Sequence, residues 1–259
     1  MIQKEPIKST LQYKINEIQE QGYCILKNHF SHDDINACRN NFWPTLNQYL
    51  KQHGNKCNRG TNRHFLPMPF NPPCFTPNFF FNDEVLTIAK HVMDDRIVAD
   101  QWGCDVPVKG SEYQGIHVDY QRPLFNEIPN LLLPVYMLVV NFGLVKITGE
   151  NGPIEIAPCT HRMPGKEAFE AIEAGEIKLR PIHLDMGDVL IRHPWALHRG
   201  TPNITDVPRV LLTIRYVRNW YYDASRDVSS IPNAVWNILN LEQKKIMRFP
   251  IADSIISKI

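Results

Sequence analysis

The chain has 259 residues, of which 43% are hydrophobic and 21% charged, with a formal net charge of +1. This near-neutral balance gives the protein no large positive charge that would attract phosphate backbones or acidic lipid. We therefore expect no nucleic-acid partner and no membrane partner. The first ten residues lack the apolar core of a secretory signal, and no run of about 18 apolar residues occurs. Six scattered cysteines without a C-x-x-C pair predict free thiols. We expect a cytoplasmic protein, monomer or homodimer, that acts on a small molecule.

The first elements in chain order are a helix and a strand. Leu11, Ile15 and Ile18 recur at helical spacing, which predicts a helix over 8–21. The short apolar run at 23–26 follows a glycine and predicts a strand.

Two further helices are predicted in the N-terminal region. Ser31 is followed three residues later by Asp34, a spacing that resembles a capping box and predicts a helix running to about Leu50. Another helix fits 83–93. Because helices dominate this part of the chain, we expect residues 1–95 to support a core that follows them.

A proline-rich stretch over 58–82 separates these helices. It holds five prolines and six phenylalanines, a mixture that suits neither a helix interior nor a central strand. The stretch therefore predicts a long ordered loop, of the kind that often forms lids or binding walls.

Beyond residue 95 the pattern changes to short strands separated by Gly, Pro and Asn. The predicted strands cover 97–102, 113–120, 134–145, 153–158, 177–184, 187–192 and 209–217. This density of strands and turns favours a mainly β protein with flanking helices (α+β), built on a double-stranded β-helix, the cupin-like jelly roll. We expect one domain over 1–259, with helical support over about 1–95, the jelly-roll core over about 96–220 and a helical tail over about 221–259.

Three His-x-Asp tripeptides are candidates for metal binding, because residues two apart on a strand face the same side. They begin at His32, His117 and His183. The first lies in a predicted first helical turn, where positions two apart diverge by about 200°. The third has the pattern of the wet face of an edge strand. His117-Val118-Asp119 alternates in the same way, so periodicity alone does not separate it from the third.

A third ligand is needed, because two imidazoles and one carboxylate on one face leave three adjacent sites open on an octahedral iron. His198 is the candidate, since it follows a predicted strand over 187–192 and opens a turn-rich stretch suited to the mouth of a barrel. Arg209 begins the next strand, which is otherwise apolar. A guanidinium there needs a partner, and a carboxylate could bind it with two hydrogen bonds.

In their order and separation, these pieces resemble the phytanoyl-CoA dioxygenase family (PhyH-like) of non-haem iron, 2-oxoglutarate-dependent oxygenases, over roughly residues 20–220. The matching segments are Gln114–Asp119, Thr148–Pro153, Pro158–Arg162 and Gly187-Asp188 leading to His198, with Arg209 eleven residues beyond that histidine.

The resemblance implies specific roles. His117, Asp119 and His198 would be the catalytic ligands of Fe(II). Arg209 would bind the distal carboxylate of the co-substrate 2-oxoglutarate, whose keto acid end chelates the metal. O₂ would be the oxidant, and ascorbate a possible addition in vitro. Related halogenases carry Ala or Gly where this chain has Asp119, which favours hydroxylation over halogenation.

Three further residues are candidates for contacts to the cofactors. Members of the family often carry Ser two residues after the distal histidine, whereas this chain has Gly200, and a substitute role for Thr201 stays open. Asn141 lies in an apolar strand and must be hydrogen-bonded to something, which leaves structural bonding and cofactor contact both open. Gln114 is a candidate for orienting the nearby His117 through a hydrogen bond.

Five residues are candidates for the substrate pocket: Tyr120, Arg122, Trp195, Arg63 and Arg215. The first three adjoin the predicted metal ligands in sequence, with core packing as the ordinary interpretation of the aromatic ones. Arg63 lies at the edge of the proline-rich stretch, where loop hydrogen bonding is the alternative. Arg215 shares a strand face with the predicted co-substrate arginine, with a solvent-facing strand end as its alternative.

The combined pattern predicts an Fe(II)- and 2-oxoglutarate-dependent dioxygenase that hydroxylates an unactivated C–H of a small metabolite, with release of succinate and CO₂. A non-catalytic jelly-roll ligand-binding or sensor protein is the alternative, because a jelly roll does not itself imply catalysis. A metal-assisted hydrolase that uses bound water is a third interpretation. The sequence does not identify the substrate.

Overall fold

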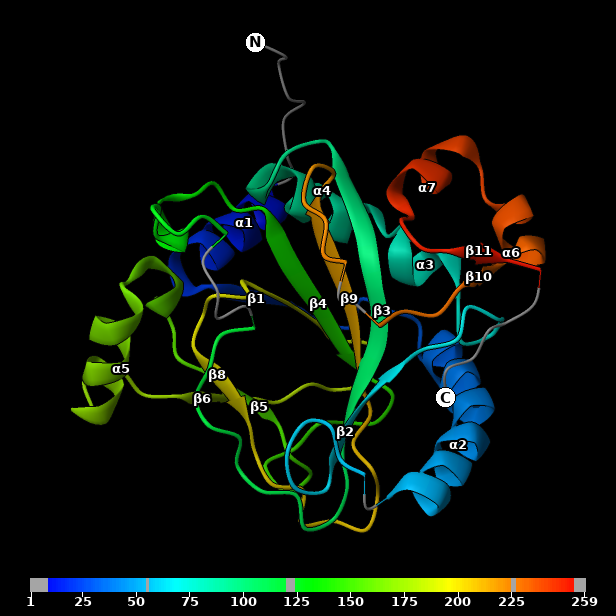
Figure 1. Cartoon of the computed structure of the whole chain (residues 1–259), viewed down its shortest axis with the longest axis horizontal. Helices are drawn as coiled ribbons and strands as arrows, with labels where there is room; N and C mark the ends of the chain where they lie inside the picture. The colour runs from blue at the N-terminus through cyan, green and yellow to red at the C-terminus, as the bar shows by residue number, and fades with distance from the viewer. Residues whose placement is uncertain (1–8, 55, 120–123, 225–226, 254–259) are drawn as a thin grey trace.

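A six-stranded antiparallel sheet forms the larger half of the fold in the computed structural model, which describes residues 9–54, 56–119, 124–224 and 227–253 (Figure 1). Its strand order is β1-β7-β4-β9-β3-β2. The strands are β1 (Tyr23–Leu26), β2 (Arg63–Pro67), β3 (Ile97–Pro107), β4 (Met137–Gly143), β7 (Val189–Arg192) and β9 (Leu211–Arg218). Thus both edge strands come from the first 95 residues, so the sheet extends into the region predicted to be helical support.

A smaller antiparallel sheet lies opposite the larger one and completes the jelly roll (Figure 1). Its order is β6-β5-β8, with β5 (Ile154–Ile156), β6 (Arg180–Ile182) and β8 (His198–Gly200). The predicted mainly β architecture with flanking helices is confirmed. The stretch after His198 was expected to be turn-rich, but it forms β8 because three of its residues pair with β5.

Alternating side chains on the larger sheet separate a core from a cavity. On β9, Leu212 and Ile214 face the main hydrophobic core, whereas Thr213 and Arg215 line a cavity. This alternation is the period of two that a strand imposes. The inward face can therefore carry polar groups while the outward face packs against helices.

Helices cover the outward face of the larger sheet and supply much of the core. In chain order they are α1 (Ser9–Gln21), α2 (His32–His53), α3 (Pro77–Phe80), α4 (Asp83–Val92), α6 (Asn233–Ile238) and α7 (Leu241–Ile246). The remaining helix, α5 (Gly165–Glu173), packs through Ala168 against Leu197 beside the smaller sheet, and two short 3-10 turns are η1 (Asn130–Leu132) and η2 (Thr160–Arg162). The Ser31 side chain accepts hydrogen bonds from the backbone of Asp33 and Asp34, as the helix-start signal predicts. The tail also pairs β10 (Ile231–Pro232) with β11 (Ile251–Ala252).

The proline-rich stretch 58–82 is not a loop throughout, contrary to the prediction. It contains β2 and α3, and its prolines fit because β2 is an edge strand that ends at Pro67, while Pro77 begins α3. Four of its six phenylalanines are buried, and two of these, Phe79 and Phe80, pack against Trp102 on β3. The stretch therefore supplies core packing as well as one wall of the cavity.

The cysteines and the helices bear on two expectations drawn from composition. The six cysteines are free thiols, as predicted. Within the described ranges, no helix has the length and apolar character needed to cross a membrane.

Candidate active site

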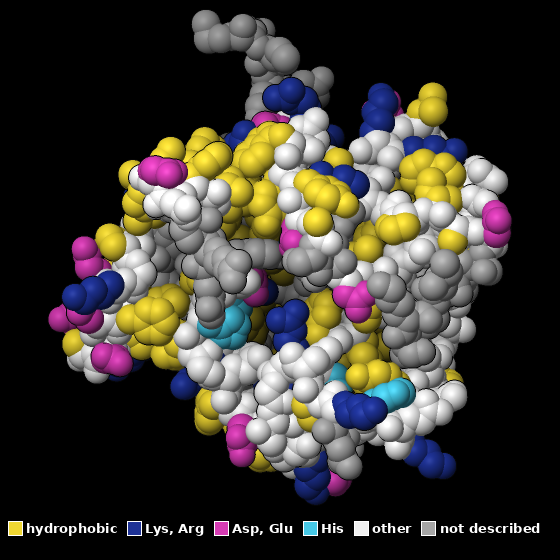
Figure 2. Space-filling model, viewed as in Figure 1, with side chains coloured by type: hydrophobic (Ala, Val, Ile, Leu, Met, Phe, Trp, Pro, Cys, Tyr) yellow, Lys and Arg dark blue, Asp and Glu magenta, His cyan; other side chains and the backbone are white. Residues whose placement is uncertain are grey.

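The two sheets enclose a cavity of about 350 Å³. Its walls come from the inward faces of β3, β4, β7 and β9 on one side and from β5 and β8 on the other. Charged side chains of both signs line it: Arg59, Arg63, Arg192, Arg209, Arg215, Asp105, Asp119, Asp223 and Asp227. Figure 2 shows a hollow near the middle of the face, with basic, acidic and histidine side chains around it. A cavity this polar suits an ionic ligand.

His117 and His198 lie directly opposite each other across an antiparallel bridge. Each backbone N–H donates to the carbonyl of the other at 2.9 Å, so the two side chains emerge on the same face. Their ring centroids are 4.5 Å apart. The strand predicted over 113–120 reduces to this single bridge among its described residues, because the segment bonds to Pro194 and Gly200 at irregular intervals on either side of it.

Backbone carbonyls fix the orientation of both imidazoles. Nδ1 of His117 lies 2.7 Å from the carbonyl oxygen of Gly115, and Nδ1 of His198 lies 2.8 Å from that of Ala196. A carbonyl oxygen only accepts, so each Nδ1 carries the proton and each Nε2 keeps its lone pair for a metal. Burial, together with the nearby His198, lowers the pKa of His117, which favours the neutral form that a metal requires.

Asp119 is the third predicted metal ligand and lies on the loop beside His117. Its Oδ1 lies 3.4 Å from Nε2 of His198, and its Oδ2 accepts a hydrogen bond from Nη1 of Arg192 at 2.7 Å. Partial desolvation alone would raise the pKa of this carboxyl, but the charge of the Arg192 guanidinium and its hydrogen bond hold the pKa well below the ordinary range. The carboxylate is therefore ionised and oriented.

These three side chains fit a single metal ion. One ligand atom from each of His117, Asp119 and His198 lies within 4.8 Å of the others. Two neutral imidazole nitrogens and one carboxylate oxygen on one face are the donor set of non-haem Fe(II) oxygenases, and they leave positions open for other ligands. The arrangement can thus hold iron and still admit a chelating co-substrate.

Arg209 lies deeper in the same cavity, just before β9 begins. It is 1% exposed, and its Nη2 lies 3.0 Å from Oδ2 of Asp105 on β3. Its Nε also donates to the carbonyl of Gly152 at 2.9 Å. Burial lowers the pKa of Arg209 to about 10, so the guanidinium still carries its charge at neutral pH. The Arg209 guanidinium thus has one carboxylate partner within the protein, Asp105.

The three other predicted cofactor residues have hydrogen bonds within the protein. The hydroxyl of Thr201 donates to the carbonyl of Pro153. Asn141 lines the cavity, donates to Thr213 and accepts from Arg192, so structural bonding is present. Gln114 was expected to orient His117, but it bonds instead to the carbonyl of Arg59 and the N–H of Gly200. The backbone carbonyls described above take over the orienting role.

The predicted substrate residues do not all line the cavity. Arg63 and Arg215 both line the cavity and are 1% exposed, so the solvent-facing alternative for Arg215 is wrong. Arg215 makes two hydrogen bonds to Asp100. Trp195 packs against Tyr136 and lines a neighbouring pocket, in keeping with its alternative as a core aromatic. Tyr120 and Arg122 lie outside the described residues.

Sequence reasoning missed two residues that organise the site. Arg192 ends β7 and contacts Asp119, and Asp105 on β3 binds both Arg63 and Arg209. Arg192 is the one charged residue in the otherwise apolar strand Val189–Arg192, where burial demands a partner. That signal identified Arg209 and applies equally to Arg192, but it does not single out Asp105, because β3 also carries Asp100 and Gln101.

A jelly roll with these ligands in its cavity defines a class of metal-dependent enzymes, and comparison with known proteins narrows the class. A family model described as "Phytanoyl-CoA dioxygenase (PhyH)" matches residues 18–211. Because this span covers most of the chain, the protein belongs to that family. The predicted resemblance is confirmed, and the family, together with the ligand set, supports iron and 2-oxoglutarate as the cofactors.

Solved structures of similar fold include one alpha ketoglutarate dependent enzyme and one protein bound to nickel and 2-oxoglutarate. The non-heme alpha ketoglutarate dependent carbocyclase SnoK from nogalamycin biosynthesis aligns over 82% of this chain and 85% of its own, at 14% identity and a TM-score of 0.60. AviO1 from Streptomyces viridochromogenes Tue57 aligns over 86% and 99%, at 15% identity and 0.61. HygX from Streptomyces hygroscopicus, solved with nickel and 2-oxoglutarate, aligns over 83% and 89%, at 15% identity and 0.58. At these identities the likeness is one of fold.

Proposed function

We propose that this protein is an Fe(II)- and 2-oxoglutarate-dependent dioxygenase that hydroxylates an unactivated C–H of a small metabolite. In the balanced reaction, substrate, O₂ and 2-oxoglutarate give the alcohol, succinate and CO₂. The observation that carries the proposal is the convergence of the His117, Asp119 and His198 ligand atoms within 4.8 Å, in one cavity with the buried Arg209.

The protein's own residues would bind and orient the reactants. His117, Asp119 and His198 would hold the iron, and Arg209 would bind the distal carboxylate of 2-oxoglutarate through charge-assisted hydrogen bonds. The bound iron and co-substrate supply the oxidising chemistry, while the enclosing sheets limit access of water. Asn141 and Arg192 would keep the carboxylate of Asp119 in place, because they are hydrogen-bonded to each other beside it.

Substrate size and kind follow from the cavity and from similar folds. The cavity of about 350 Å³ also has to contain 2-oxoglutarate, which favours a small molecule or one portion of a larger one. HygX has been solved with hygromycin B and SnoN with nogalamycin RO, so this fold accommodates small natural products elsewhere. SnoN is an epimerase and SnoK a carbocyclase, and the product assay must therefore separate several outcomes. We expect a cytoplasmic enzyme that is a monomer or a homodimer.

A screen for substrate-dependent succinate release tests the proposal. Purified protein with Fe(II), 2-oxoglutarate and ascorbate is incubated in air with amino acids, acyl-CoA thioesters and other metabolites, and products are identified by mass spectrometry. Hydroxylation predicts the gain of one oxygen atom and one succinate per turnover, both absent in His117→Ala. Turnover without O₂ or 2-oxoglutarate would contradict the proposal in favour of a hydrolase. Binding of 2-oxoglutarate without succinate release across the panel would favour the sensor alternative.

A further inference from the structure

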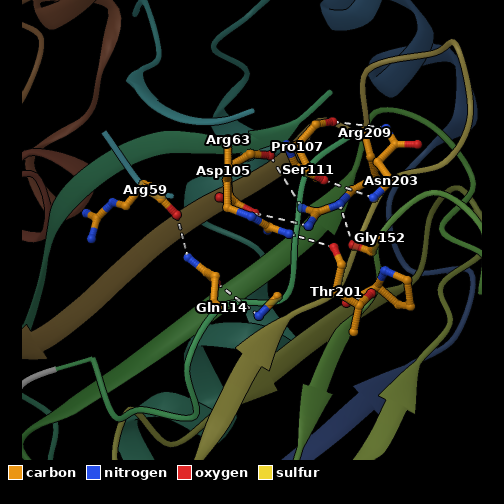
Figure 3. A network of polar contacts seen from close by, with 12 residues as sticks. Arg59, Arg63, Asp105, Pro107, Ser111, Gln114, Gly152, Thr201, Asn203 and Arg209 are labelled. Atoms are coloured by element: carbon orange, nitrogen blue, oxygen red, sulfur yellow. Dashed lines mark hydrogen bonds and ion pairs between the residues drawn. The ribbon is translucent and has the colours of Figure 1, made fainter. Parts of the chain in front are cut away.

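Arg63 shares the end of the cavity that holds Arg209, and its guanidinium is enclosed there (Figure 3). The side chain reaches from edge strand β2 to the end of β8 and is 1% exposed. Nη1 donates to Oδ2 of Asp105 at 2.9 Å, and Nη2 donates to the carbonyl of Thr201 at 2.6 Å. Its buried Nε has no hydrogen-bond partner among the described residues. Arg63 therefore retains capacity to donate a hydrogen bond.

Gly200 makes room for this guanidinium. A Cβ at position 200 would lie 2.3 Å from Nη1 of Arg63, 2.5 Å from its Cζ and 2.7 Å from its Nη2. The φ of Gly200 lies outside the left-handed region, so the backbone conformation does not require glycine there. The close approach of Arg63 accounts for it. Any larger residue would displace the guanidinium from the cavity end.

The charges at this end of the cavity are unbalanced. A single oxygen, Oδ2 of Asp105, is shared by Nη1 of Arg63 at 2.9 Å and Nη2 of Arg209 at 3.0 Å (Figure 3). Burial would raise the pKa of the Asp105 carboxyl, but the two arginines lower it, so it is ionised. Two buried cations and one anion leave one positive charge. Since a buried uncompensated charge is unfavourable, this cluster would be stabilised by one further carboxylate.

The distance from the metal ligands suits a dicarboxylate. Gly200 and His198 lie two residues apart on β8, and both line the cavity. Two residues of a strand span about 6.6 Å, which is comparable with the length of a five-carbon dicarboxylate. A molecule chelating a metal beside His198 would thus place its far carboxylate near Arg63 and Arg209.

We propose that Arg63 and Arg209 together form a two-arginine site for the distal carboxylate of the co-substrate, and that Gly200 is present because the Arg63 guanidinium occupies the space of a side chain. This assigns Arg63 to the co-substrate, although its position at the edge of the proline-rich stretch had suggested a substrate contact. The assignment rests on the proposed function, because it takes 2-oxoglutarate as the co-substrate. No bond is made or broken at Arg63, which acts by binding.

The test compares two keto acids that differ at one end. Dissociation constants are measured by calorimetry on the nickel-loaded protein for 2-oxoglutarate and for 2-oxopentanoate, which has a methyl group in place of the distal carboxylate. Arg63→Gln should reduce the preference for 2-oxoglutarate by about tenfold or more, the loss expected for one charge-assisted hydrogen bond, while 2-oxopentanoate affinity stays unchanged. Arg63→Lys should restore part of the preference. Thermal unfolding with nickel shows that each variant is folded.

Gly200→Ser provides a second variant, which leaves the Arg63 residue unmutated but displaces its guanidinium. It should also reduce the preference for 2-oxoglutarate, and it should cause little further loss in the Arg63→Gln background, because both changes remove the same guanidinium from the site. Equal losses for both keto acids would indicate a structural role and overturn the proposal.

The two proposals fail in different ways. If wild type prefers 2-oxoglutarate and Arg209→Gln loses that preference while folded Arg63→Gln keeps it, the Arg63 assignment is wrong and the proposed function stands. If nickel-loaded wild type binds neither keto acid, the proposed function itself is wrong and the assignment falls with it.

Discussion

Arg192 donates from Nη1 to Oδ2 of Asp119 at 2.7 Å and from Nε to Oδ1 of Asn141 at 3.0 Å. A guanidinium thus connects a residue on β4 with a predicted metal ligand on the loop beside β8. Because Oδ2 of Asp119 is already bonded, Oδ1 is the oxygen that points toward His198. The arrangement favours a carboxylate that binds metal through one oxygen, with the other held by the protein.

Replacing Arg192 should weaken metal binding. Arg192→Gln removes the charge and shortens the side chain, so Asp119 loses its fixed orientation. Residues that orient metal ligands typically change metal affinity by about 10–100-fold, and we expect a loss in that range. Calorimetric titration with nickel measures it. Arg199→Gln is the control, because Arg199 bonds to Glu155 away from the ligands. Unchanged or tighter binding in Arg192→Gln would contradict the orienting role.

Removing Trp102 should destabilise the fold strongly. Trp102 is fully buried, contacts Phe80 and Phe142, and donates from Nε1 to the carbonyl of Pro69. Large-to-small changes of this kind cost about 3–5 kcal/mol, and Trp102→Ala should reduce the free energy of unfolding by that amount in urea titrations. Trp220→Ala is the matched control. Trp220 is 53% exposed and should cost about 1 kcal/mol or less. Equal losses would mean that the aromatic core is misplaced.

His193 should make the protein sensitive to acid. Burial, with a smaller effect from His161, lowers the pKa of His193 from 6.5 to about 3. Above pH 6.5 the imidazole is neutral in both the folded and the unfolded chain, so it has no effect. Between pH 6.5 and 3 only the unfolded chain takes up the proton, which costs about 1.4 kcal/mol of stability per pH unit, or about 2 kcal/mol at pH 5.

His193→Asn tests this sensitivity. Its Oδ1 can accept the hydrogen bond that Nδ1 of His193 accepts from the Trp195 backbone. Urea unfolding at pH 7.5 and at pH 5 should show a smaller loss of stability on acidification for the variant than for wild type. An identical loss in the two proteins would assign the acid sensitivity to other groups.

Much of the fold could be predicted from local pattern, because strands and helices with clear periodicity formed where expected. β1 and α4 match their predicted ranges within a residue or two. β8 was missed because its residues, His198–Gly200, carry no apolar alternation, and only pairing with β5 makes them a strand. β2 was missed because its prolines and its place at the sheet edge are a matter of tertiary context.

In the candidate site, too, the sequence indicated the predicted ligands but not the residues that hold them in position. Residue type and spacing made His117, Asp119 and His198 candidates, the family resemblance selected them, and the structure brings them together. The partners of these residues could not be inferred, because Arg192 and Asp105 reach them through sheet register rather than through sequence distance. The alternative tripeptide shows the limit of pattern: His183 and Asp185 are exposed, and Asp185 pairs with lysines at the surface.

The central claim is that His117, Asp119 and His198 hold one iron ion that 2-oxoglutarate then chelates. Anaerobic titration of the protein with Fe(II) and 2-oxoglutarate, followed by visible absorption, tests it most directly. We predict a metal-to-ligand charge-transfer band that saturates at one iron and one 2-oxoglutarate per chain. The band should be lost in His117→Ala and His198→Ala and kept in His183→Ala. A wild-type protein that gives no such band, or a His198→Ala variant that gives it in full, would contradict the account.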